Sequence, residues 1–325
     1  MGCRTFGAAL LVVWGFAGSV AQAQAAYPDR PVTLVVPYAP GGPTDIVARA
    51  VGQKLSDVLH QPVVIDNRPG ANESIAADHV AKARPDGYTF LFATDAALAL
   101  NAQLFAKLSY NPATDFVPVT RVADCHMVMV VPPAVGVGNL AQFVSRAKSL
   151  AQPLPYASAG VGNSTHLAME WFARQADFRV NHLPYKGITA ALPDLVAQRV
   201  DAMFSAAAGV APYIEKGQLV PLAASGTSRS RTLPQVPTFT EAGYPNFEAA
   251  FYLGLVAPKG TPAEAVNRLA AEVSRIVRHP EFSQRAEATW GLQTVGDSPA
   301  EFAEFLRRDR ASAADRVKIS GARLD

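Results

Sequence analysis

Two glycine-rich turns hold most of the residues that could bind a ligand. The first turn follows an apolar, β-branched run at 32–36 and precedes a helical pattern that begins at 46. Its candidate binding residues are Tyr38, Pro40, Gly41, Gly42, Pro43, Thr44 and Asp45. Thr44 or Asp45 can cap the helix, and the two glycines let a ligand approach the backbone with no Cβ in the way. Because the first free N–H groups of the helix face this turn, it is a favourable site for an anion.

The second turn repeats this design in the other half of the chain. An apolar run at 154–157 leads into it, and a helix that carries Leu167 and Trp171 follows it. The candidate binding residues are Ser158, Ala159, Gly160, Gly162, Asn163 and Ser164. Either turn alone could be an ordinary tight turn with a capped helix. Two similar turns with many small donors instead predict two lobes that hold one small anionic ligand between them.

Further candidates lie where other predicted strands end. Apolar runs at 62–66 and 88–94 are followed by loops at 70–74 and 94–96, which share one edge of a parallel sheet with the first turn. These loops and the second half of the chain add Ala71, Asn72, Glu73, Asp95, His166, Tyr185, Lys186 and Ser205 as candidates. Lys186 could offer its charge to a carboxylate, or it could be a solvated surface lysine.

Motifs for other chemistry are incomplete. His166 and Glu170 lie four residues apart, but no H-E-x-x-H motif and no third metal ligand accompany them, so an intrahelical hydrogen bond is the expected role. The sequence at 136–141 fits a dinucleotide fingerprint only nominally, because it follows two prolines and lacks the acidic partner. We therefore expect no metal, no cofactor and no catalytic residue. The alternative is an exported enzyme that uses His166, Glu170 or Asp45 in acid–base chemistry on a small carboxylate.

Composition limits the class of protein. The chain has 325 residues, of which 49% are hydrophobic and 17% are charged. The charged fraction is below the roughly 25% of an average globular protein, and the formal net charge is only +2. These values argue against a disordered chain and against a nucleic-acid partner. A chain of this length is expected to divide into two units, each with its own core.

The first 25 residues have the pattern of a signal peptide. Arg4 precedes an apolar segment at 6–20, and two small-x-small sequences predict cleavage near residue 23 or 25. Cys3 would leave with this segment, so Cys125 would remain alone and no intramolecular disulfide could form. No later segment has the roughly 18 uninterrupted apolar residues of a membrane span. We expect a protein that is exported to a bacterial periplasm and does not itself span the membrane.

The order of predicted elements describes two lobes. Strand and helix patterns alternate, which predicts an α/β fold in which each lobe is a mainly parallel sheet flanked by helices. In the second half, strands are predicted at 127–131, 154–157, 180–185, 201–204 and 219–224, and an apolar run returns at 252–257. Three helices follow, at 263–278, 281–289 and 299–312. We predict that 27–126 and 254–325 form the first lobe, that 127–253 form the second, and that two chain crossings make a hinge.

These residues also resemble a known family. The motifs that carry the resemblance are Tyr27-Pro28 with Arg30-Pro31, Pro40 to Asp45, Asn67 to Ala71, Pro85 to Thr89, Ser158 to Gly160 with Gly162, His166-Leu167, Pro184 to Gly187, Leu233-Pro234, Val236 to Thr238, and Ala257-Pro258 with Gly260 to Pro262. In this order they resemble the extracytoplasmic substrate-binding proteins of the tripartite tricarboxylate transporter type (Bug/TctC-like receptors). The resemblance implies a two-lobed, type II periplasmic-binding-protein fold. Such a receptor closes on a small carboxylate and delivers it to the membrane subunits of a transporter, and we expect it to be a monomer.

Two departures from the family pattern affect the ligand. The family loop usually continues with two glycines where this chain has Asn72 and Glu73, and Ser205 replaces a common Asp or Asn. Asp45, Glu73 and Asp95 would repel additional carboxylates on a ligand and attract an amino group, so we predict a zwitterion such as an amino acid. In the alternative interpretation, Asp45 and Glu73 cap helices and Asp95 faces solvent.

Overall fold

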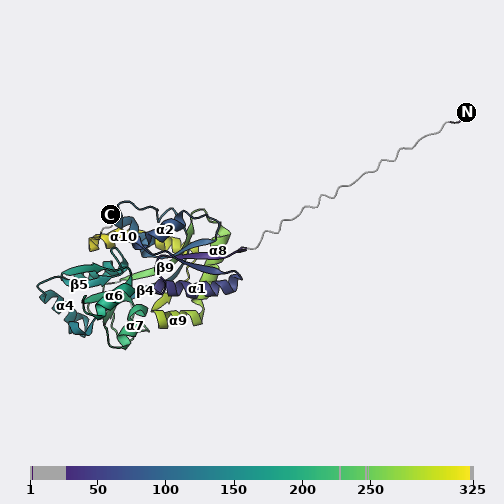
Figure 1. Cartoon of the computed structure of the whole chain (residues 1–325). Helices are drawn as coiled ribbons and strands as arrows, with labels where there is room; N and C mark the ends of the chain where they lie inside the picture. The colour runs from purple at the N-terminus through teal and green to yellow at the C-terminus, as the bar shows by residue number, and fades with distance from the viewer. Residues whose placement is uncertain (1, 3–26, 227, 246, 248, 323–325) are drawn as a thin grey trace.

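The computed structural model describes residue 2 and residues 27–322, except 227, 246 and 248. The predicted signal peptide, residues 1–25, therefore lies outside the described residues, apart from Gly2. In the part of the chain that is described, no helix is both long and apolar enough to cross a lipid bilayer. The described residues form a mixed sheet of ten strands that is flanked by helices (Figure 1).

Three parallel strands form one end of the sheet, in the order β2-β1-β3. They are β1 (Val32–Val36), β2 (Val63–Asn67) and β3 (Thr89–Thr94). Parallel pairing sets Val32 opposite Val63 and Thr33 opposite Thr89. The predicted strands are confirmed to within one residue at each end, and the loops that follow them start from one edge of the sheet.

A long strand, β4 (Phe116–Val131), belongs to both halves of the sheet. Its residues 116–126 pair antiparallel with β9 (Ala250–Pro258), which also pairs antiparallel with β3, and the short β10 (Leu292–Thr294) lies along 123–125. The sequence predicted only 127–131 as strand. Polar residues such as Arg121 and Asp124 interrupt the apolar run before it, and two register shifts bend the strand there.

The last part of β4 opens the second half of the sheet. Residues 127–131 pair antiparallel with β7 (Ala202–Ala206) and β8 (Val220–Ala224). Beyond β7, strand β5 (Leu154–Ser158) pairs in parallel with β7 and with β6 (Val180–Pro184). Each half thus keeps the predicted parallel strands, and the antiparallel β4 and β9 between them make the sheet mixed.

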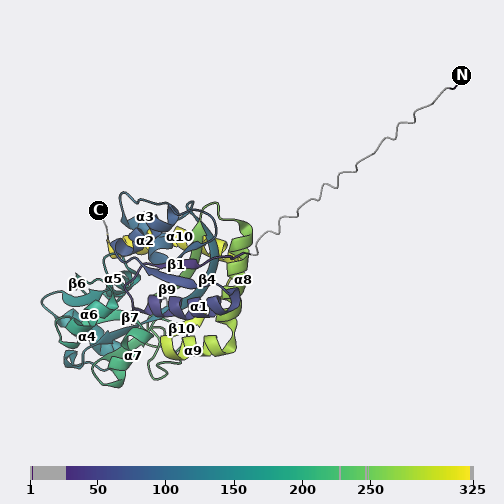
Figure 2. The same ribbon diagram turned by 45° about the vertical axis from the view of Figure 1, so that its right-hand side comes forward.

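The helices surround the sheet, and two groups of them lie on different sides of the molecule. The longer ones are α1 (Pro43–Leu59), α2 (Ser74–Ala81), α4 (Leu140–Ser149), α5 (Ser164–Ala176), α6 (Ile188–Val196), α7 (Ala207–Glu215), α8 (Ala263–Arg278), α9 (Pro280–Trp290) and α10 (Pro299–Ser320). Short turns of helix are η1 (Ala71–Glu73), η2 (Ala96–Leu100), α3 (Asn101–Leu104) and η3 (Pro133–Val135). Figures 1 and 2 show α4, α6 and α7 on one side of the molecule and α1, α8 and α9 on the other.

Two helices differ from the sequence prediction. Helix α10 continues to Ser320 rather than ending at 312, and α7 begins at Ala207, where only a loop was predicted after Phe204. The extra turns of α10 place Ala313 and Val317 in an apolar cluster with Leu100 and Leu167. Helix α10 therefore packs against α5 as well as against the first half of the sheet, which the predicted lobe boundaries did not anticipate.

Each half of the sheet has a core of its own. In the first half, residues such as Leu34, Phe92 and Leu269 pack between the sheet, α1 and α8. In the second half, an aromatic cluster includes Phe172 and Phe239, whose ring centroids are 5.1 Å apart. Separate cores of this kind are expected where two units share only a few connecting strands.

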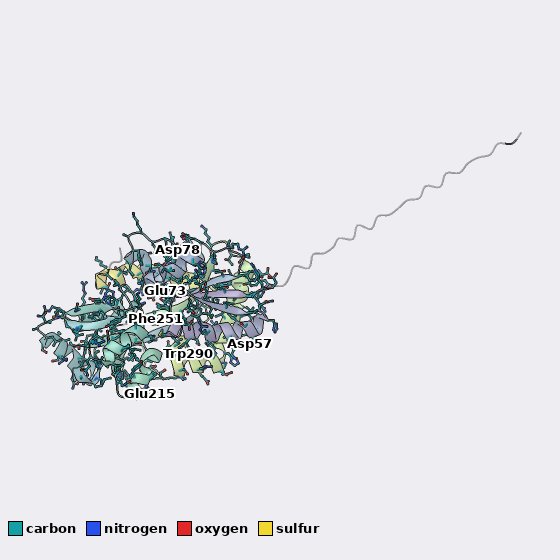
Figure 3. All side chains as sticks on the ribbon, viewed as in Figure 1. Asp57, Glu73, Asp78, Glu215, Phe251 and Trp290 are labelled. Carbon is teal, nitrogen blue, oxygen red and sulfur yellow. The ribbon has the colours of Figure 1, made fainter. Side chains whose placement is uncertain are left out.

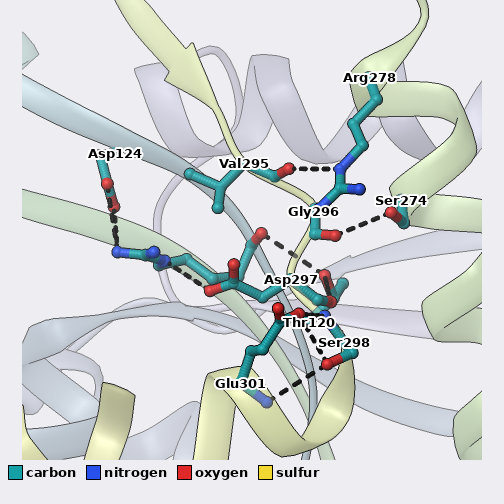
Figure 4. A network of polar contacts seen from close by, with 10 residues as sticks. Thr120, Asp124, Ser274, Arg278, Val295, Gly296, Asp297, Ser298 and Glu301 are labelled. Carbon is teal, nitrogen blue, oxygen red and sulfur yellow. Dashed lines mark hydrogen bonds and ion pairs between the residues drawn. The ribbon is translucent and has the colours of Figure 1, made fainter. Parts of the chain in front are cut away.

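A polar network anchors the start of α10 to the bent part of β4 (Figure 4). Arg121 Nε donates to Asp297 Oδ2 at 2.9 Å, and Thr120 Oγ1 donates to the Asp297 carbonyl at 2.7 Å. The next residue, Ser298, caps the helix: its Oγ accepts from Glu301 N, and its own N–H donates to the Glu301 carboxylate at 2.8 Å. This reciprocal pair is a capping box, which satisfies two N–H groups that would otherwise lack partners.

We expect Ser298→Ala to lower the free energy of unfolding by about 1 kcal/mol, because the helix loses its N-cap acceptor. Urea unfolding measures this change. A matched control is Ser283→Ala in α9, where the hydroxyl donates only to the Pro280 carbonyl at 3.2 Å. Equal losses in the two variants would contradict a specific role for the cap.

Candidate functional site

The two glycine-rich turns line one cavity of about 340 Å³ between the halves of the sheet. From the first turn come Tyr38, Ala39, Pro40, Gly41, Gly42, Pro43 and Thr44, and from the second come Ala159, Asn163, Ser164 and Thr165. The remaining lining residues are Thr94, Lys186, Gly187, Ile188, Thr189, Ala206 and Phe251. Among the described residues that line this cavity, Lys186 is the only one with a charged side chain. The two turns therefore line the same cavity, as the sequence predicted.

The first turn presents backbone donors to this cavity. Gly41 has a φ of 83°, a conformation that glycine adopts easily, and a Cβ built there would meet no atom within 4 Å. Helix α1 begins at Pro43, which has no N–H. Its N-cap residue is Gly42, which has no side chain to accept a hydrogen bond from the first turn of the helix. In the described chain the N–H groups of Thr44 and Asp45 have no hydrogen-bond partner. They are the free donors at the positive end of a 17-residue helix.

Asp45 holds the turn in shape instead of facing the ligand. Its carboxylate accepts from Gly41 N at 2.8 Å, from Arg49 Nε at 2.9 Å and from Asn67 Nδ2 at 2.8 Å. Burial raises the pKa of this carboxyl, but the hydrogen bonds from Arg49, Gly41 and Asn67 outweigh burial and leave the pKa below its usual range. Asp45 is therefore a buried, ionised support of the turn.

The second turn is also fixed from within. Asn163 caps α5 by accepting from Thr165 N at 3.1 Å, and Thr165 Oγ1 accepts from Ala159 N at 2.9 Å. Ser164 does not keep its hydroxyl for a ligand, because Oγ lies 2.8 Å from Asp95 Oδ1 and donates to that carboxylate. The donors left for a ligand are thus the backbone at the start of α5 and the amide of Asn163, which also reaches Tyr38 Oη at 3.4 Å.

A stacked pair of histidines supports the second turn from behind. The rings of His166 and His182 lie 3.9 Å apart and nearly parallel. Nδ1 of His166 accepts from Gly162 N at 3.0 Å, and Nε2 of His182 lies 2.6 Å from Ser158 Oγ. Burial lowers the pKa of His166 to about 3 and that of His182 to about 4, and the neighbouring imidazole adds to the effect at His166. Both rings are therefore neutral at neutral pH.

These histidines do not reach the central cavity. Ser158 is fully buried and His166 nearly so, and neither residue lines it. The Glu170 carboxylate lies 3.8 Å from His166 Nε2 and accepts from the Tyr156 hydroxyl at 2.7 Å. Ser158 and His166 were predicted to contact the ligand, but the structure places both of them behind the turn.

Glu73 and Asp95 are also buried and have partners. The Glu73 carboxylate accepts from the Tyr38 hydroxyl at 2.6 Å, from the N–H groups of Thr94 and Ala97, and from the Thr94 hydroxyl. Asp95 accepts from Ser164 and lies 3.5 Å from Arg316 Nη1. Burial raises the pKa of both carboxyl groups, to about 7 for Asp95 in spite of the nearby guanidinium of Arg316.

The acidic residues were predicted either to face an amino group or to cap helices and face solvent. The structure has neither arrangement. Asp45 and Asp95 are 1% exposed and Glu73 is 2% exposed, and each makes several hydrogen bonds or ion pairs within the protein. Although Glu73 occupies the N-cap position of α2, its side chain makes no capping hydrogen bond. The central cavity thus has no free carboxylate among its described lining residues.

The backbone is strained where this chain has Asn72 and Glu73 in place of the usual two glycines. Ala71, Asn72 and Glu73 have φ values of 45°, 46° and 73°, all in the left-handed region that residues with a side chain rarely occupy. Two glycines would adopt this conformation without strain. In this chain the hydrogen bonds of Glu73 to Tyr38 and β3 hold it instead, as does the bond from Asn72 Nδ2 to Asn101 Oδ1 at 2.9 Å.

The other predicted site residues are not among the described residues that line the central cavity. Ala71, Asn72, Glu73, Gly160 and Tyr185 line an adjoining cavity of about 660 Å³, which shares Tyr38, Asn163 and Lys186 with the central one. Gly162 packs against Leu104, because a Cβ built there would lie 2.4 Å from that side chain. Ser205, also a predicted ligand contact, is fully buried, its hydroxyl donates to the Ala206 carbonyl at 3.0 Å, and it is not among the described residues that line the central cavity.

Sequence reasoning missed part of the lining. Ile188 and Thr189 begin α6 directly after Gly187, so they repeat the pattern of a glycine followed by a helix start that identified the two turns. Phe251 lies in an apolar strand, where it resembles an ordinary core residue (Figure 3). Only the packing of β9 between the two halves exposes it to the cavity.

Comparisons with known proteins agree with this geometry. A family model described as the tripartite tricarboxylate transporter family receptor matches residues 47–317. Protein BugT of Bordetella pertussis is 34% identical over 299 residues, which are 92% of this chain and 91% of that protein. The structure of R. palustris Rpa4515 with adipate is 34% identical, with a TM-score of 0.88 over 92% of this chain and all of that one. MatC from Rhodopseudomonas palustris with bound malate is 31% identical, with a TM-score of 0.82 over 90% of this chain and all of that one.

The fold and the cavity between its halves define a two-lobed α/β solute-binding protein of the periplasmic-binding-protein type. The chain belongs to the tripartite tricarboxylate transporter family of receptors. Solved structures similar to this chain include that of the periplasmic binding protein BugD, at 30% identity.

The histidine pair generates a testable pH dependence. The folded pKa values of about 3 and about 4 lie below the ordinary value of 6.5, so the unfolded chain binds more protons between roughly pH 4 and 6.5. The pair therefore destabilises the fold progressively as the pH falls through this window. In the variant His182→Asn one of these titrations is removed, and we expect the melting temperature of the wild type to fall relative to the variant between pH 7 and pH 4.

The control is His60→Asn, at the exposed end of α1, where asparagine also accepts the φ of 53°. It replaces a histidine with the same residue outside the stacked pair. A difference for His182→Asn that stays constant from pH 7 to pH 4 would show that His182 does not titrate in the folded state as described.

Proposed function

We propose that this protein is a periplasmic receptor that captures a small carboxylate in the cavity between its lobes and delivers it to the membrane subunits of a tripartite tricarboxylate transporter. The observation that supports this most directly is that both turns present backbone donors to one cavity. The N-terminal ends of α1, α5 and α6 all line it, and Lys186 adds a positive charge. Relatives with adipate and with malate bound support a carboxylate as the ligand class.

Backbone donors suit a receptor that must also release its ligand. A carboxylate bound by N–H groups needs no buried arginine, whose burial without a ligand would be unfavourable. In the proposed mechanism the ligand joins the lobes, 27–126 with 254–325 and 127–253, by contacting both turns at once. Small-angle scattering should therefore show compaction when ligand is added, and an unchanged radius of gyration with a ligand proven to bind would exclude closure.

The protein is proposed to bind its ligand without altering it. The polar pairs that could act as acid and base, Ser158 with His182 and His166 with Glu170, lie behind the second turn and not among the cavity-lining residues. Mass spectrometry of the ligand recovered after prolonged incubation tests this point. Unchanged ligand supports a receptor, whereas a converted product supports the alternative of an exported enzyme. Export through a signal peptide cleaved near residue 23 or 25, and a monomeric state, are further parts of the proposal.

A zwitterionic ligand receives less support than a simple carboxylate. The three acidic side chains that motivated it are engaged within the protein, so an amino group would meet no free carboxylate among the described lining residues of the central cavity. Calorimetric titration with glutamate beside malate and adipate compares the two classes directly.

Gly42→Val tests the first turn. Gly42 has a φ of −76° and a ψ of 165°, so valine can adopt its backbone conformation, and the added Cβ would only touch the Ala39 carbonyl oxygen at 3.5 Å. The positive φ in this turn is at Gly41, so it does not restrict the substitution at Gly42. The valine side chain would occupy the space of the ligand, so we expect at least a tenfold loss of affinity for adipate or malate with an unchanged melting temperature.

The matched control is Gly138→Val, in an exposed loop where a new Cβ also has room. It should bind as the wild type does. Wild-type affinity in Gly42→Val itself would exclude the first turn from the binding site.

A further inference from the structure

The central cavity continues into an apolar arm. A second cavity, of about 230 Å³, shares with it Gly41, Pro43, Thr44, Ile188, Thr189, Ala206 and Phe251. The residues that line only this arm are Ile46, Val47, Cys125, Leu192, Gly209, Tyr213, Leu253, Trp290 and Leu292. The two cavities are therefore parts of one crevice, and a ligand held at the first turn can extend from one into the other.

The chemistry of the arm differs from that of the turns. Leu253, Trp290 and Leu292 form one wall, from β9, the end of α9 and β10, and they are 1%, 7% and 4% exposed. Leu192 and Tyr213 come from the other half of the sheet, on α6 and α7. In Figure 3, Phe251 and Trp290 lie near the boundary between the two groups of helices. Among the described residues that line the arm, none has a charged side chain.

An uncharged wall selects against a second carboxylate. A carboxylate that left water for this arm would find no cation among the described lining residues, and burying an unpaired charge is strongly unfavourable. A hydrocarbon body would instead gain from leaving water, in proportion to the apolar area that it buries. The volume is also suitable, since an apolar cavity of about 150 Å³ already accepts benzene. Aromatic walls such as Trp290 and Phe251 favour a flat ring in particular.

We propose that the preferred ligand is a monocarboxylic acid with a ring-sized apolar body, whose carboxylate binds at the helix starts of the two turns and whose ring occupies the arm beside Trp290 and Phe251. This inference rests on the proposed receptor function and specifies its ligand class. It differs from the dicarboxylates in the two related structures, adipate and malate.

Calorimetric titration of the mature protein with a series of acids tests the proposal. The series is benzoate, phenylacetate, 3-phenylpropanoate, malate, adipate and citrate. We expect at least one ring-bearing acid to bind ten or more times more tightly than malate and citrate. If malate or citrate binds at least as tightly as every ring-bearing acid, the arm is not a ligand subsite, but the receptor function stands. If none of the carboxylates binds, the proposed function itself fails.

Ile46→Trp fills the arm and leaves the central cavity unchanged. Ile46 lines the arm but not the central cavity, and it is 41% exposed, so a larger side chain can be accommodated there without disturbing the core. The variant should lose at least tenfold in affinity for the ring-bearing acid and keep its affinity for malate. Val64→Trp, on β2 at 48% exposure and outside all three cavities, is the matched control and should change neither. Unchanged ring-acid binding, or equal losses for both acids, in Ile46→Trp would overturn the proposal.

Tryptophan fluorescence provides a second readout, which can also be measured on the wild-type protein. The chain has three tryptophans, of which Trp14 lies in the predicted signal peptide, Trp171 lies outside the arm and Trp290 lines it. A ring-bearing acid should change the emission in the wild type and in Trp171→Phe, but not in Trp290→Phe. If the change survives in Trp290→Phe and is lost in Trp171→Phe, the ring does not occupy the arm.

Discussion

The pairing of β4 with strands of both halves is the constraint on which the site depends. Residues 116–126 of this strand belong to the first half of the sheet, through β9, and residues 127–131 belong to the second, through β7 and β8. Because one continuous strand sets the position of both halves, the turns after β1 and β5 open toward the same space. The two turns are far apart in sequence, yet they line one cavity.

Inside each turn, side chains fix the backbone so that the backbone can serve the ligand. Asp45 orders the first turn through Gly41, and Asn163, Thr165 and His166 order the second. The side chains with the strongest hydrogen-bonding capacity are thus used within the protein, and main-chain N–H groups remain for the ligand. Such donors contact only the carboxylate, so they do not distinguish between ligands that differ elsewhere. The walls of the crevice must therefore determine which ligand is preferred.

Strong local signals made much of this architecture predictable. The run at 32–36, the glycines after it and the helical period from 46 specify β1, the turn and α1 through neighbours in sequence. What failed depends on residues distant in sequence. Nothing near Glu73 indicates that Tyr38 and Thr94 will donate to it, and nothing near Asp95 indicates Ser164 and Arg316. The first part of β4 was missed because its polar residues find partners such as Asp297, which lies far along the chain.

The burial of Asp95 has a consequence for the acid tolerance of the fold. Its pKa is raised to about 7 from the ordinary 3.8, so between these values the folded chain holds a proton that the unfolded chain has released, and its contribution to stability is lost as the pH rises through this window. The pKa values of His166 and His182 are shifted the other way, so their contribution increases with pH over much of the same interval. The two effects of pH on the free energy of unfolding therefore have opposite signs. Over mildly acidic pH, the effect of Asp95 offsets that of the two histidines.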